Sequence, residues 1–144
     1  MRTAIRNPIH NEKGLTLVEL LAVIVILGVI AAIAVPAIGG VIKNSRENAD
    51  TQTEQLIKDT ALRYLTDLDP DGDGNTSSGT PVLTLSGGAG TLNVTALVPS
   101  YLRSVPRKQS ESTPTWYSTI PVTYSAANGW EIGAGNLGTT TTAP

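Results

Sequence analysis

The chain has 144 residues, a formal net charge of −2, one His and no Cys. Without cysteine, no disulfide can stabilise the fold. No Ser or Lys stands in a recognisable nucleophile motif, and the single His, His10, lies close to the N-terminus. We therefore predict that the chain is not an enzyme. The length is that of one domain, and the weak negative charge gives no sign of a nucleic-acid surface.

An apolar run near the N-terminus dominates the sequence. From Leu20 to Ile42 no residue is charged, and this run is longer than the roughly 20 apolar residues that a bilayer-spanning helix needs. The residues before it include three basic side chains and one acidic one. Because positive flanks tend to stay in the cytoplasm, we predict a single-pass membrane helix with its C-terminal side directed outward.

Glu19 is the acidic residue at the start of this run. An ionised carboxylate at the depth of a helix centre would be unfavourable by roughly 2.5–3.5 kcal/mol, so its position needs a physical reason. One interpretation is that Glu19 reaches the lipid headgroups from the end of the span. The other is that it meets a positively charged partner.

The residues at this junction read Lys13-Gly14-Leu15-Thr16-Leu17-Val18-Glu19-Leu20-Leu21. Four features coincide: a basic leader, Gly14, a Glu four residues after Leu15, and a long apolar helix that begins at the same place. Together they resemble the class III signal of type IV pilins and type II secretion pseudopilins. That family more often has Phe where this chain has Leu15. A secretory signal peptide would instead have a short apolar core and a small-residue cleavage site.

The resemblance implies how the N-terminus is processed and used. In this family, a membrane aspartyl peptidase cuts after the Gly, here Gly14, and methylates the new amino terminus, here Leu15. In the assembled filament, the carboxylate of Glu19 would pair with the N-terminal amine of a neighbouring subunit. A buried ion pair adds little net stability, but a single buried charge is costly, so the pair would act chiefly to set the register of assembly.

We predict an α+β fold, with one long N-terminal helix packed against a small antiparallel sheet. The predicted segments are a removable leader (1–14), a transmembrane and assembly helix (15–42), an amphipathic continuation (43–66), a β-sheet head with an acidic loop (67–134) and a flexible Thr-rich tail (135–144). Pro36 cannot donate a helical hydrogen bond, and Gly28 loosens the same helix. A kink is predicted there, and partial melting in a filament is the alternative that the family suggests.

The amphipathic continuation has two faces. Opposite charges at four-residue spacing support a solvated face; they are the pairs Lys43/Glu47, Arg46/Asp50, Glu54/Lys58 and Asp59/Arg63. The residues expected to carry the head are Ala49, Leu56, Ile57, Ala61, Tyr64, Leu65 and Leu68. Strands are predicted at 82–85, 92–95, 116–119, 121–125 and 129–132, with a hairpin turn at Asn128-Gly129.

Asp69, Asp71 and Asp73 alternate along the acidic segment that ends the predicted helix, and Gly74 follows them. Alternate carboxylates with a Gly at the sharp turn match the first half of a calcium-binding loop. The twelfth position counted from Asp69 is Thr80 rather than the bidentate Glu, so the second half does not match. Some pseudopilins of this family bind calcium in the head. We keep two interpretations, a distorted calcium site and a solvated acidic turn.

Arg103, Arg107 and Lys108 form a basic cluster. Such a cluster could contact DNA or an acidic neighbouring subunit, but a solvated face is the commoner role. We therefore predict no nucleic-acid partner from it.

The family resemblance predicts a structural subunit of a type IV pilus, a helical homo-oligomer. Its expected partners are the prepilin peptidase, an assembly ATPase with its platform protein, and the cytoplasmic membrane before export into a surface filament. One alternative is the major pseudopilin of a type II secretion or competence DNA-uptake system. The alternative from another class is an unassembled single-pass membrane protein with a binding head.

Overall fold

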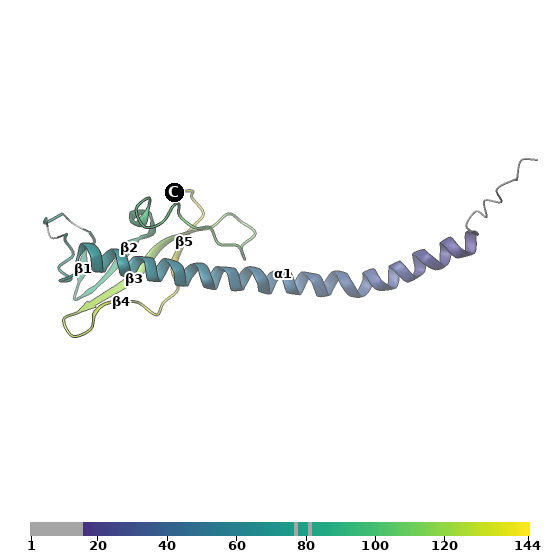
Figure 1. The fold of residues 1–144 in the computed structure, drawn as a ribbon, viewed down its shortest axis with the longest axis horizontal. Coiled ribbons are helices and arrows are strands. Elements are labelled where there is room, and N and C mark those ends of the chain that lie inside the picture. The colour runs from purple at the N-terminus through teal and green to yellow at the C-terminus, as the bar shows by residue number, and fades with distance from the viewer. Residues whose placement is uncertain (1–15, 77, 81) are drawn as a thin grey trace, which may run out of the picture. The chain divides into compact units, whose positions relative to one another are not determined.

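The computed structural model describes residues 16–76, 78–80 and 82–144. The chain divides into two compact units, Met1–Val41 and Ile42–Pro144. The predicted α+β fold is confirmed: one long helix, α1 (Leu17–Leu68), is followed by a small antiparallel sheet (Figure 1).

The described part of the first unit is the apolar beginning of α1. Its large apolar side chains, from Leu17 to Val41, are 51–82% exposed. By length and composition the helix could cross a membrane. Helical structure continues through Gly28 and Pro36. A kink at these residues would therefore change the direction of the helix without ending it. The kink itself stays a prediction.

In the second unit, α1 becomes amphipathic. Its buried residues are spaced seven, four and four residues apart, which places them along one face of the helix; they are Asp50, Ile57, Ala61 and Leu65. The helix ends at Leu68, two residues beyond the predicted end, because the following Asp69-Pro70 pair disfavours the helical conformation only from Asp69 onward.

Two expectations for this part of α1 were wrong. Leu56 does not face the head, because its side chain is 57% exposed. Asp50 is not an exposed partner of Arg46: it is buried and binds backbone amides. Among the described residues, the ion pairs on α1 are Lys43–Glu47 (3.7 Å) and Arg63–Asp67 (3.8 Å). Both are exposed and contribute little.

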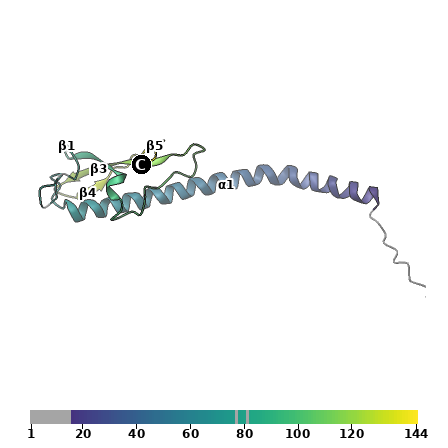
Figure 2. The same cartoon turned by 90° about the horizontal axis from the view of Figure 1, so that it is seen from above.

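The sheet is built on one long central strand. Its elements are β1 (Leu85–Ser86), β2 (Ala89–Asn93), the 3-10 helix η1 (Val94–Leu97), β3 (Trp116–Ser125), β4 (Gly129–Ile132) and β5 (Gly138–Thr140). All pairings are antiparallel, in the order β1-β2-β3-β4, with β5 also on β3. The strands lie along one side of the C-terminal part of α1 (Figure 2). Since β2 occupies one edge of β3, β4 and β5 share the other.

The two strands predicted at 116–119 and 121–125 are one strand, with Pro121 inside it. The N–H of Gly133 donates to the carbonyl of Pro121 at 2.8 Å, so the nitrogen of Pro121 points to the same edge. The ladder on that edge is interrupted there, because the pairs with β4 begin at Val122 and the pairs with β5 end at Thr119. Pro121 has no N–H to donate, but no ladder hydrogen bond is lost, because no strand pairs with β3 at this position on that edge.

The tail predicted to be flexible at 135–144 contains strand β5, which corrects that expectation. β5 pairs with the first residues of β3, and the side chain of Leu137, just before it, is buried in the core. β-branched threonines favour an extended strand, and a buried apolar anchor fixes where the strand lies. Composition alone does not show either contact.

The core lies between α1 and the sheet. The largest side chains that are fully buried are Tyr117, Ile57, Leu65, Leu92, Leu97 and Ile120. At the edge of the core, the ring of Trp130 contacts Tyr124 edge to face, with ring centroids 5.2 Å apart. The indole N–H of Trp130 donates to the backbone carbonyl of Asp69, which ties β4 to the end of α1.

We expect Leu65→Ala to destabilise the head by about 2–5 kcal/mol, since Leu65 is fully buried and the cavity would remain. Leu62→Ala is the matched control: Leu62 is 39% exposed on the same helix, so its loss should be about 0.5 kcal/mol or less. Urea unfolding of the full-length chain in detergent, followed by circular dichroism, measures both. Equal losses would contradict this assignment of the core face.

Candidate functional site

The N-terminus of α1 is closed by two side chains that bind each other. The N–H of Glu19 donates to the hydroxyl oxygen of Thr16, and the N–H and hydroxyl of Thr16 both donate to Oε2 of Glu19, each at 3.2 Å. The first helical bond runs from the N–H of Leu20 to the carbonyl of Thr16 at 3.1 Å. This reciprocal arrangement is a capping box.

The capping box gives Glu19 a defined place. Its carboxylate lies in the first turn of α1, where the positive end of the helix dipole stabilises negative charge. It also satisfies backbone and hydroxyl donors that would otherwise lack an acceptor in an apolar environment. The carboxylate is thus held at the N-terminal end of the apolar helix.

Sequence reasoning selected Glu19 but missed Thr16. The signal was present, because Thr16-x-x-Glu19 directly before an apolar run is the sequence pattern of a capping box. Gly14 and Leu15, the predicted cleavage and methylation residues, lie outside the described residues. Their roles, and the pairing of Glu19 in a filament, stay predictions.

The acidic loop after α1 brings together the three predicted calcium ligands. Asp69, Asp71 and Asp73 each place a carboxylate oxygen within 4.8 Å of the others. Asp69 is fully buried, whereas the other two face solvent. The set is entirely of oxygen donors, which suit a hard divalent cation.

Asp69 organises the loop. Its Oδ1 accepts hydrogen bonds from the N–H groups of Gly72 (2.9 Å) and Asp73 (3.1 Å), and its Oδ2 accepts one from Gly74 (2.8 Å). Gly74 has a φ of +87°, and a Cβ there would lie 2.7 Å from the carbonyl oxygen of Leu83. This turn therefore requires glycine.

Burial raises the pKa of Asp69 above its ordinary value, and a hydrogen bond with Asp71 raises it further, although the backbone donors act in the opposite direction. A cation between these carboxylates would offset their repulsion. The donor set therefore fits the first half of a calcium loop. Because three acceptor positions of Asp69 already serve the backbone and Thr80 replaces the bidentate Glu, the fit is partial.

In the basic cluster, Arg103 and Arg107 are exposed and Lys108 is half-buried. The Nζ of Lys108 pairs with Oε1 of Glu111 at 3.4 Å, and Arg107 forms an isolated bridge with Trp116 through the backbone. Local contacts of this kind are those of an ordinary solvated loop.

Comparison with known families matches residues 9–35 to the prokaryotic N-terminal methylation motif. The matched range contains Gly14, Leu15, Glu19 and the capping residue Thr16. It confirms the resemblance to type IV pilins and type II secretion pseudopilins. Comparisons with curated proteins and with solved structures gave no match.

The motif at these residues supports a type IV pilin-like or pseudopilin protein. Its class III signal implies processing by a prepilin peptidase and association with the membrane, and the apolar beginning of α1 fits a membrane anchor. The matching family is a structural one and not a family of enzymes.

If the acidic loop binds calcium, the ion should raise the Tm of the full-length chain, by an amount that corresponds to about 2.7 kcal/mol at a hundredfold excess over Kd. Asp71→Asn should abolish the shift while leaving the backbone bonds of Asp69 in place. Asp59→Asn, an exposed carboxylate on α1, should retain it. Thermal unfolding with and without calcium measures the shift in Tm. An unchanged Tm would show that the loop is a solvated acidic turn and not a calcium site.

Proposed function

We propose that the chain is a structural subunit of a type IV pilus filament. It polymerises through the apolar beginning of α1 after cleavage behind Gly14 and methylation of the amine of Leu15. The observation that supports this most directly is the methylation motif at residues 9–35, which continues into a helix whose large apolar side chains from Leu17 to Val41 are all exposed.

Such a helix needs an apolar environment at every stage. Burying one Val, Leu or Ile side chain contributes about 1.5–3 kcal/mol, and this part of α1 carries such residues on all sides. Lipid would cover them before assembly. Sister helices in the centre of a filament would cover them afterwards.

Glu19 would then change partners during assembly. In the membrane, the capping box with Thr16 satisfies its carboxylate inside one chain. Cleavage behind Gly14 converts a peptide nitrogen into an ammonium group on Leu15, and the carboxylate of a neighbouring subunit can pair with it. Because an unpaired charge in the apolar bundle is strongly unfavourable, this pairing would select one register of addition.

The remaining partners follow from this role. A prepilin peptidase would process the chain, an assembly ATPase and platform protein would extract it from the cytoplasmic membrane, and the product would be an extracellular filament. A pseudopilin of a secretion or DNA-uptake system would share the same motif and helix. It differs in forming a short fibre that stays at the cell envelope.

The first test is where the processed chain is found. Cells are sheared, the filaments are pelleted, and the intact mass and N-terminal peptide are measured. We expect a chain that begins at methylated Leu15 in the sheared fraction. The processed chain found in membranes alone would favour a pseudopilin, and an intact Met1 in cells with an active peptidase would overturn the proposal.

The second test concerns Glu19. Glu19→Ala should abolish or strongly reduce sheared filaments while the membrane level of the chain is retained, since the carboxylate that sets the register is lost. Glu47→Ala is the matched control, because Glu47 is an exposed carboxylate further along α1. Normal filaments from the Glu19 variant would show that this carboxylate has no part in assembly.

A further inference from the structure

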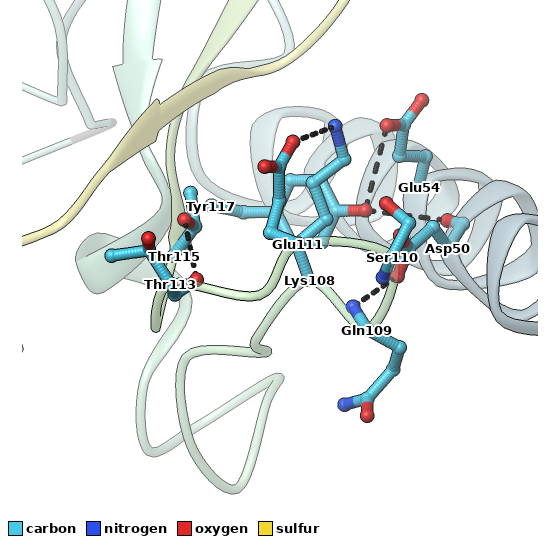
Figure 3. A network of polar contacts seen from close by, with 9 residues as sticks. All are labelled: Asp50, Glu54, Lys108, Gln109, Ser110, Glu111, Thr113, Thr115 and Tyr117. Carbon is cyan, nitrogen blue, oxygen red and sulfur yellow. Dashed lines mark hydrogen bonds and ion pairs between the residues drawn. The ribbon is translucent and has the colours of Figure 1, made fainter. Parts of the chain in front are cut away.

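One carboxylate on α1 outside both sites is almost entirely buried. The side chain of Asp50 is 4% exposed. Its Oδ1 accepts a hydrogen bond from the N–H of Gln109 at 2.6 Å, and its Oδ2 accepts one from the N–H of Ser110 at 2.8 Å (Figure 3). Two consecutive backbone amides of a loop therefore bind both oxygens of one carboxylate on the helix.

The loop that Asp50 binds has few other means of holding its position. It belongs to the connection 98–115 between η1 and β3, and long connections without regular structure are usually functional. Residues 109–114 are all exposed and contain no large apolar side chain, so the hydrophobic effect does not fix them. Within the described residues, the hydrogen bonds that join 108–115 to α1 all end at Asp50: they come from the two backbone N–H groups and from the side chain of Ser110.

The internal bonds of the segment shape it but do not attach it to the helix. The N–H of Lys108 donates to the carbonyl of Thr115 at 2.8 Å, and the hydroxyl of Thr115 donates to the carbonyl of Thr113 at 3.0 Å. The segment is thus a closed loop that meets α1 at Asp50.

Charged and titratable groups surround Asp50 on three elements. Lys108 lies on the loop and also pairs with Glu111. Glu54 lies one turn further along α1, and the hydroxyl of Tyr117 on β3 donates to Oε1 of Glu54 and to the backbone carbonyl of Asp50, both at 3.4 Å.

Burial raises the pKa of Asp50, but the hydrogen bonds from Gln109 and Ser110 and the charge of Lys108 outweigh it, so the pKa lies below its ordinary value. Asp50 is therefore ionised at neutral pH. Burial also raises the pKa of Tyr117, and the nearby carboxylates add to this effect, so Tyr117 remains a neutral donor.

We propose that Asp50 is a clamp: in its ionised form it holds the segment 108–115 against α1, and on protonation it releases this segment while the head stays folded. The inference depends on the contacts within the head and is independent of the proposed filament. Hydrogen bonds to a charged group are stronger than those to a neutral one, so the loss of one charge weakens both attachments at once.

The head can stay folded because its core lies elsewhere. The core residues on α1 are Ile57, Ala61 and Leu65, which pack against β2, β3 and η1, and none of residues 109–114 contributes to it. Opening the segment therefore exposes polar backbone and little apolar surface. Release of the segment is therefore a local opening, and its free energy is separate from the free energy of unfolding of the whole head.

The direction of the pH dependence follows from the lowered pKa. The contribution of Asp50 is fully present above the ordinary carboxyl value, about 3.9, and is lost as the pH falls through the lower value in the folded protein. The segment should accordingly be held at neutral pH and open in acid.

A spin label tests the clamp in the full-length chain. Because the chain contains no cysteine, Ser112→Cys provides a single attachment site in the exposed segment. We expect restricted label motion at pH 7 in detergent. Adding Asp50→Asn should mobilise the label and increase the open population about tenfold or more, whereas adding Asp59→Asn, an exposed carboxylate on the same helix, should leave the motion restricted.

Circular dichroism on the same samples separates release from unfolding. Restricted label motion in a folded Asp50→Asn variant would overturn the clamp. If that variant does not fold, the test is an acid titration of the parent labelled chain, in which label motion and circular dichroism are both followed. Mobilisation before the loss of dichroism supports the proposal, and mobilisation only together with that loss overturns it.

Discussion

Water is a poor environment for the side chains that α1 carries from Leu17 to Val41. They are aliphatic on every side of the helix, and more than half of the surface of each large one is exposed. A helix satisfies its own backbone donors and acceptors, so it can enter lipid without leaving polar groups unpaired. The same property lets identical helices pack together when the lipid is removed. Membrane anchoring and assembly are thus two ways of meeting one physical requirement.

The head meets a different requirement, since it must fold in water with a small core and without disulfides. The second part of α1 provides one apolar face, and the sheet centred on β3 provides the other. Trp130 and Leu137 then connect the edges of the sheet to this core. So small a head makes few contacts in total. The short Thr-rich strand β5 and the side chain of Trp130 at the edge of the core therefore both contribute to holding it together.

Four carboxylates in the described residues bind backbone amides and not basic side chains. Asp73 accepts a hydrogen bond from the N–H of Asn75 within the acidic loop, and the other three act on α1. Glu19 closes the N-terminus of α1, Asp69 closes the turn that follows its C-terminus, and Asp50 holds a loop against its middle. In each case the carboxylate supplies acceptors to N–H groups that regular secondary structure leaves unsatisfied. The exposed ion pairs on the same helix are weaker contacts, so the acidic residues matter here chiefly as hydrogen-bond acceptors.

Much of this organisation could be predicted from local sequence. The apolar run, the motif around Gly14 and Glu19, the end of α1 near Pro70 and the alternation of Asp69, Asp71 and Asp73 each depend on neighbours within one or two turns. The same local rules failed where a partner far along the chain decided the outcome. Four-residue spacing suggested that Asp50 pairs with Arg46, but its partners are Gln109 and Ser110.

The sequence by itself determined that an apolar helix begins at a processing motif, because length, hydrophobicity and the order of a few residues suffice for that. Only the tertiary structure decided which face of α1 is covered, that Leu56 is exposed, that Pro121 lies inside one long strand, and that β5 forms from a tail with no apolar pattern. These outcomes depend on contacts between residues that are distant along the chain, and such contacts form only when helix and sheet exclude water together.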